Sequence, residues 1–174
     1  KNTFFIAKFV GNAAQSGVYG FKLNPKGAGF ELGEDKLLVG GILPTGIDFG
    51  PDGAMYIADW IDGWGTHSYG RIWKLDDKRG AAFAERQQTK TLLASDFGQK
   101  ADHELTALLQ NAVMQVRLKA QFQLATRGEA GEAAFKKTLF QNTHQLGRIH
   151  AIWGISQMAR KDKKYAGILV SALQ

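Results

Sequence analysis

The spacing of the hydrophobic positions changes near residue 80. Before that point it follows a period of two, and glycine-rich turns separate short apolar runs. This pattern is typical of half-buried strands joined in antiparallel sheets. The strands predicted in this way cover residues 3–9, 18–23, 30–37, 46–49, 54–58 and 71–75, with tight turns at 24–27 and 50–53.

From about residue 81 the pattern becomes helical, and it repeats with a period of 31. The motif Leu108-Leu109-Gln110-Asn111 recurs as Leu139-Phe140-Gln141-Asn142. The helices predicted in pairs cover 102–110 with 113–127 and 129–140 with 146–161, and a third pair starts near residue 165. A repeat of helical hairpins is typical of an α-solenoid such as HEAT or armadillo. Because a stable stack needs about three repeats, we expect the chain to be a piece of a longer protein.

These two patterns predict a β-then-α organisation in three segments. Residues 1–80 are predicted to be the C-terminal part of an antiparallel β-propeller, 81–101 a linker, and 102–174 HEAT-like helical repeats. In a propeller blade four strands meander outwards from the axis. The strands at 46–49, 54–58 and 71–75 would be the first three of one blade, and the three earlier strands the last three of the blade before it. The chain would thus supply under two blades of a propeller that needs at least four.

Composition narrows the class of protein. A 44% share of hydrophobic and 22% of charged residues is that of an ordinary folded chain. No apolar run approaches the roughly 18 residues of a membrane span, so no transmembrane segment is predicted. The chain has no cysteine, which excludes disulfides, a cysteine nucleophile and covalent c-type haem attachment within these residues. The first residues, KNTFFI, resemble the middle of a strand and not a signal peptide.

The net charge of +6 is compatible with an acidic partner or with a solvated basic surface. No run of five like charges and no groove-reading motif is present, so we expect no nucleic-acid partner. The densest basic cluster, residues 160–164, lies at a predicted helix end, where cations are favoured in any case.

The candidate site is the loop at residues 60–70, between two predicted strands. On blade geometry, Thr45 lies on the same face of the propeller as this loop. Asp59, Asp62 and Thr45 offer oxygen ligands for a cation such as Ca²⁺, although their spacing lacks the density of a dedicated calcium loop. His67 is either a general base or ligand, or an exposed loop residue.

Two tryptophans and an arginine complete the set of candidates. Trp60 and Trp64 either form a stacking wall for a planar cofactor or sugar ring, or cap the core. Arg71 pairs either with an anionic ligand or with Asp59.

The helical half is predicted to carry no catalysis. Phe122, Phe135 and Trp153 lie on apolar helix faces and are predicted to pack in the core, whereas His150 is predicted on a surface or groove. Arg117 and Arg148 share a repeat position and are predicted to hydrogen-bond between repeats.

The order of four segments resembles a known family. The segments are SGVYGFKLNPKGAGFEL, LPTGIDFGPDGAMYIADWIDGW, GRIWKL and ELTALLQNAVMQVRLKAQFQLATRG. Together they resemble a family of large proteins described as membrane-bound dehydrogenases with a haem-binding domain. In that family a glucose/sorbosone dehydrogenase-like (NHL-type) propeller runs into HEAT repeats, and a cytochrome c-type domain often follows.

The resemblance implies a fragment of an exported, periplasmic or extracellular quinoprotein-like dehydrogenase that oxidises a sugar or another alcohol. It implies pyrroloquinoline quinone and calcium as cofactors of the full-length protein and haem c in a domain absent here. The CxxCH motif and the earlier blades are missing, so no catalytic residue carries over and the isolated chain is expected to be inactive. The alternative is a non-catalytic propeller and HEAT scaffold that binds a polysaccharide or protein. On either hypothesis the remainder of its own longer chain is a partner.

Overall fold

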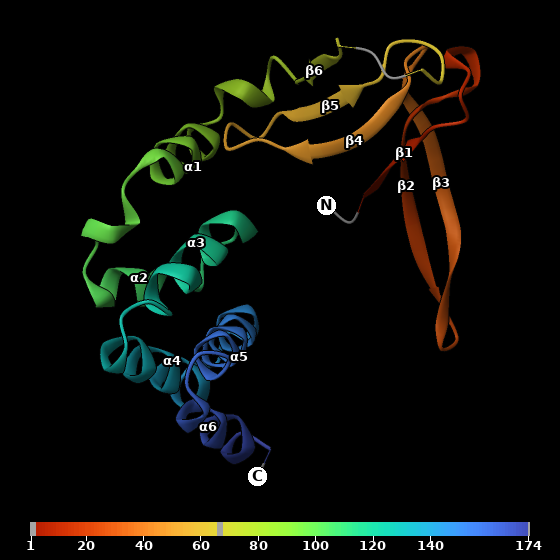
Figure 1. Ribbon diagram of the computed structural model, residues 1–174. Coiled ribbons are helices and arrows are strands. Elements are labelled where there is room, and N and C mark those ends of the chain that lie inside the picture. Colours follow the sequence, from red (N-terminus) through yellow and green to blue (C-terminus); the bar gives the residue numbers. More distant parts are fainter. Residues whose placement is uncertain (1–2, 66–67, 174) are drawn as a thin grey trace. The chain divides into compact units, whose positions relative to one another are not determined.

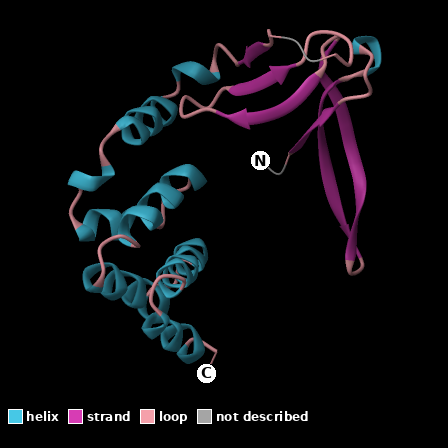
Figure 2. Cartoon of the chain, in the orientation of Figure 1, coloured by secondary structure: helices cyan, strands magenta, loops and turns pink. Residues whose placement is uncertain are grey.

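The computed structural model describes residues 3–65 and 68–173. It contains two three-stranded antiparallel sheets followed by helices, so the predicted β-then-α arrangement is confirmed (Figures 1 and 2). The chain divides into two compact units: a sheet unit of residues 1–86 and a helical unit of residues 87–174. Within the described residues, no helix is long and apolar enough to span a membrane.

The first sheet has the order β1-β2-β3, with β1 at Phe4–Lys8, β2 at Gly17–Lys26 and β3 at Gly29–Gly40. The β2–β3 hairpin extends well past the end of β1 (Figure 1). Its turn lies at residues 27–28, later than the predicted 24–27, with Gly27 at φ 58°. Pro25 is therefore inside β2, opposite Phe30. A proline fits there because β1 pairs only with residues 17–21 of β2, which leaves the other edge of β2 open at residue 25.

The second sheet has the order β4-β5-β6, with β4 at Pro44–Phe49, β5 at Met55–Asp59 and β6 at Arg71–Leu75. The turn between β4 and β5 lies where it was predicted, and the Gly53 N–H donates to the Gly50 carbonyl at 2.8 Å. The 60–70 loop connects β5 to β6. All six predicted strands are present, five with shifted ends and the last, 71–75, with the predicted bounds.

A small apolar core joins the two sheets of this unit. Its buried members are Val18 of the first sheet, Met55 and Ile57 of the second, and Ile42 between the sheets. Phe5 and Val39 pack against it from the same side of the first sheet. The opposite side of the first sheet is also apolar, and the second sheet does not bury it. Exposed members on that side are Phe4, Ile6, Phe30, Leu32 and Leu37.

The helical unit begins within α1, Ala84–Ala94, and continues with two hairpins. The first hairpin is α2, Asp102–Leu108, with α3, Met114–Leu124, and the second is α4, Glu129–Gln141, with α5, Gln145–Ala159. A final helix, α6, covers Ala166–Ser171. Short 3-10 helices lie at Ala13–Gln15, Gly80–Ala82, Phe97–Gln99 and Lys163–Tyr165.

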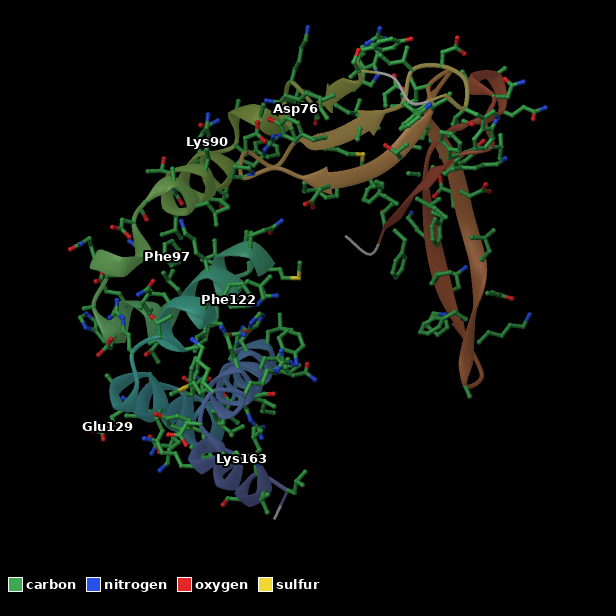
Figure 3. All side chains as sticks on the ribbon, in the orientation of Figure 1. Asp76, Lys90, Phe97, Phe122, Glu129 and Lys163 are labelled. Carbon is green, nitrogen blue, oxygen red and sulfur yellow. The ribbon has the colours of Figure 1, made fainter. Side chains whose placement is uncertain are left out.

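The core of the helical unit is continuous. Phe135, Leu105, Leu109, Leu124 and Ile155 are completely or almost completely buried in it. Phe97 belongs to the same core (Figure 3), and Leu92 and Leu93 of α1 pack against it. The stretch 81–101, interpreted as a linker from its sequence, thus contains α1 and two 3-10 helices.

Arg117 and Arg148, at equivalent repeat positions, bond within their own hairpins and not between repeats as predicted. Arg117 Nη1 donates to the carbonyls of Asn111 and Ala112, at 2.7 and 2.9 Å. Arg148 Nε donates to the Leu139 carbonyl at 3.1 Å. Each guanidinium satisfies carbonyls at or just after the end of the preceding helix, which have no partner inside that helix.

Of four environments predicted for helical residues, one is confirmed and three are wrong. Phe135 is buried as expected, but Phe122 and Trp153 are half exposed. His150, predicted on a surface, is buried instead. Helical periodicity identifies the apolar side of a helix, but whether that side is covered depends on the neighbouring helix.

Candidate functional site

At the start of the 60–70 loop, just after β5, the backbone is hydrogen-bonded and strained. The Trp60 N–H donates to the Leu43 carbonyl at 2.8 Å. Ile61 adopts φ 78°, which is costly for a β-branched residue, and Gly63 adopts φ 64°. The direction of the loop is therefore imposed by its surroundings and not by the preference of Ile61.

Asp59, at the end of β5, is the acceptor that imposes this direction. Its Oδ1 accepts from the Leu43 N–H at 2.9 Å and the Ile61 N–H at 3.0 Å, and its Oδ2 accepts from Trp73 Nε1 at 2.8 Å. The residue is only 5% exposed. Burial alone would raise the pKa of Asp59, but the bonds from Trp73, Ile61 and Leu43, with the charge of Arg71, outweigh it and leave that pKa lowered.

This geometry does not fit the predicted role of Asp59 as a calcium ligand. Its two oxygens already serve three donors, from the segment before β4, from the loop and from β6. A carboxylate used in this way ties the strands to the loop and has little capacity left for a cation. Asp62 is exposed on the loop, and the described residues contain no group of three or more His, Asp or Glu that could hold a metal.

The indole of Trp64 is exposed and is held in place by contacts with two residues. Its ring makes an edge contact with Phe9 of the first sheet, with ring centroids 5.3 Å apart. It also lies so close to the backbone of Gly11 that a Cβ there would be 2.1 Å from the indole. Nevertheless, Trp64 is 76% exposed. An indole held on one side and open on the other can stack on a planar or apolar ligand surface.

The other predicted site residues have different environments. Thr45 is exposed, and its hydroxyl donates a long bond to the Ala58 carbonyl at 3.4 Å. Trp60 is partly buried next to Asp59. Arg71 is exposed and lies over the ring of Trp73, with Cζ 4.8 Å from the centroid, so it acts on Asp59 through its charge. His67 lies outside the described residues.

The residues that hold this loop could not be predicted from the sequence. Phe9 and Gly11 lie more than fifty positions before Trp64, and Trp73 lies fourteen after Asp59. The positive φ of Gly11, 72°, gives a reason for glycine at that position, but its partner is visible only in three dimensions.

A second polar cluster surrounds the turn between β4 and β5. Asp52 accepts from Lys74 Nζ at 2.6 Å and from the Tyr56 hydroxyl at 3.1 Å. The bond from Lys74 is the main reason that the pKa of Asp52 is lowered to about 2. Arg86 donates to the Asp52 carbonyl and pairs with Asp76, which Figure 3 labels. Because each charged group here has an opposite partner, the cluster stabilises the turn and the start of α1.

Comparison with known proteins finds no matching family model, no matching curated protein and no matching solved structure.

Proposed function

We propose that the sheet unit is part of a β-propeller, to which it contributes fewer than two blades. The support comes from the first sheet, which is apolar on both sides. One side packs on the second sheet through Val18 and Phe5, while Phe4, Ile6 and Leu32 on the other side stay exposed. Each blade of a propeller lies between two neighbouring blades, so its sheet needs apolar side chains on both sides.

We also propose that the helical unit is the start of a HEAT-like solenoid. Arg117 and Arg148, one repeat apart, play the same part in consecutive hairpins. The buried residues Leu124 and Ile155 are likewise separated by one repeat. Such equivalence is expected of stacked repeats whose cores merge.

For the site, we infer that Trp64 forms one wall for a sugar ring. The observation that carries this inference is the indole that is fixed by Phe9 and Gly11 and yet largely exposed. Sugars present apolar C–H faces, and these stack on such planes. In the full-length protein the sugar or another alcohol would be oxidised. Residues outside this chain would supply the remaining walls and hold pyrroloquinoline quinone and calcium, which would provide a two-electron acceptor, and a haem c domain outside this chain would receive the electrons. On this proposal the protein works in the periplasm or outside the cell.

Sugar binding is tested with the 174-residue chain by saturation-transfer NMR against a panel of neutral mono- and oligosaccharides. We expect transfer to the ring protons of at least one sugar, and a loss of affinity of about tenfold in Trp64→Ala, which corresponds to about 1.4 kcal/mol. Phe30→Ala is the matched control, because Phe30 is an exposed aromatic of the same unit at the distant β2–β3 hairpin end. Equal losses in both variants, or no transfer to any sugar, would refute the proposed wall.

Oxidation is tested on the full-length protein by dye reduction with added quinone and Ca²⁺ across the same panel. Activity that needs both cofactors supports the dehydrogenase.

The bonding of Asp59 favours a second candidate function, a scaffold that binds a polysaccharide or protein without catalysis. Its carboxylate is committed to three donors, and catalysis would have to come from groups elsewhere. Sugar binding that depends on Trp64, together with no dye reduction, would select the scaffold.

A further inference from the structure

Helices α3 and α5 each present exposed apolar side chains, and one pair of these occupies equivalent repeat positions. Phe122 and Trp153, which occupy the same position in consecutive repeats, are 50% and 51% exposed (Figure 3 labels Phe122). Met114 lies two turns before Phe122, and Leu146 two turns before Trp153, and both are exposed. Residues at this spacing share one side of a helix. We call these four residues the α3–α5 face.

Buried polar contacts lock the two helices together under this face. His150 Nδ1 donates to Gln121 Oε1 at 2.8 Å, and Gln121 Nε2 donates to Gln157 Oε1 at 3.4 Å. The His150 ring also makes an edge contact with Trp153, with centroids 5.0 Å apart. Because His150 and Gln121 are almost completely buried, this network fixes the relative position of the helices and the orientation of the Trp153 indole. The face is thus organised before any partner arrives.

The helical unit is basic, and the two helices of this face hold none of its acidic residues. Residues 87–174 hold 12 Lys and Arg against 6 Asp and Glu and so carry the whole net charge of +6. Neither α3 nor α5 contains an acidic residue. All six acidic side chains lie on α2, on α4 or in connections between helices: Asp96, Asp102, Glu104, Glu129, Glu132 and Asp162. Of the cations on or next to the two helices, Arg117, Lys119 and Arg148 donate to backbone carbonyls of the helical unit, whereas Arg160, the C-cap residue of α5, is exposed.

We propose that the α3–α5 face binds an acidic peptide segment that carries apolar side chains. The aromatic and aliphatic side chains would bury the apolar residues of the partner, and the net positive charge of the unit, with Arg160 at the end of α5, would attract its carboxylates and reject basic sequences. With 11 and 15 residues, α3 and α5 are about 16 and 22 Å long. That length accommodates a partner helix of roughly four turns. Met114 and Leu146 favour a peptide over a polysaccharide, since aliphatic side chains offer a sugar no stacking plane.

The test uses the 174-residue chain and a 15-residue probe peptide with Leu at helical i, i+3, i+4 and i+7 spacing and Glu elsewhere. A second probe has Lys in place of every Glu, and a third is a uronic-acid oligosaccharide. The readout is the indole N–H resonance of Trp153, identified by its loss in Trp153→Phe. We expect the Glu probe alone to shift this resonance, with an affinity that falls as salt rises. Phe122→Ser and Arg160→Glu should each weaken binding by about tenfold or more.

Phe140→Ser is the matched control, because Phe140 is 51% exposed on α4, away from the α3–α5 face. It should leave the affinity unchanged. Since Arg160→Glu alters an exposed C-cap residue, it tests the face even if Phe122→Ser fails to fold. The proposal is overturned by equal binding of the Lys probe, by a shift with the oligosaccharide alone, or by an equal loss in Phe140→Ser. A resonance that responds to dilution and to no probe would also overturn it, and would identify a second copy of the chain as the partner.

Discussion

Asp59→Asn should destabilise the sheet unit although it changes only a few atoms of one side chain. The amide oxygen can still accept from Leu43 and Ile61, but these bonds lose the charge that strengthens them, at a cost of about 1 kcal/mol together. The new NH₂ group then faces Trp73 Nε1, so two donors meet and the indole loses its partner, which costs roughly another 2 kcal/mol. The expected total is about 3 kcal/mol, or two orders of magnitude in the ratio of folded to unfolded chain.

The assay is urea denaturation in a Trp153→Phe background, so that the tryptophan fluorescence comes from the sheet unit alone. Asp48→Asn is the control, since Asp48 is exposed on β4 and accepts only from the adjacent Phe49 N–H among the described residues. It should change the free energy of unfolding by less than about 0.5 kcal/mol.

The pH dependence provides a second and independent test of Asp59. Because its pKa is lower in the folded than in the unfolded chain, its contribution is complete above the unfolded value, about 3.9, and is lost as the pH falls through the folded value. The stability difference between the parent and Asp59→Asn should therefore be constant from pH 7 to about pH 5 and should narrow at lower pH. Equal stability at pH 7, or a difference that stays unchanged down to pH 2, would refute the account of Asp59 as a charged acceptor.

Three further predictions concern buried or strained positions. Burial, with the nearby charge of Arg117, lowers the pKa of His150, so the free energy of unfolding should fall as the pH drops below about 6.5. In urea melts, His150→Gln should make the free energy of unfolding less dependent on pH. An unchanged pH dependence would contradict this. Gly154→Ala should lower the melting temperature despite the better helix propensity of alanine, because its Cβ would lie 2.2 Å from the buried Phe135 ring and overpacking costs roughly 1–3 kcal/mol; a higher melting temperature would show that the ring yields. Ile61→Asn should stabilise by about 1 kcal/mol, since asparagine tolerates φ 78° better, and a loss of stability in the same melts would mean that the packing of Ile61 outweighs its strain.

Most of the strands and helices follow from local sequence patterns, but the arrangement of the site residues does not. A period of two and glycine turns were sufficient to predict all six strands, and the repeated motifs were sufficient to predict the helical hairpins. The hairpin turn at residues 27–28 was misplaced because proline usually interrupts a strand, and only the short reach of β1 makes Pro25 acceptable inside β2. The role of Asp59 could not be predicted because its donors come from three separate segments. The exposure of Phe122 depends on how helices stack, which the periodicity of one helix does not specify.

The two repeat arginines have a consequence for how this protein can change in length. Arg117 and Arg148 each bond to carbonyls at or just after the end of the first helix of their own hairpin, so neither contact needs the next hairpin to be present. A gene duplication or deletion of one whole repeat would carry each arginine together with its acceptors and leave the register of the remaining hairpins intact. Insertion or deletion of a whole repeat is therefore expected to preserve both contacts, whereas loss of part of a hairpin would separate an arginine from its acceptors.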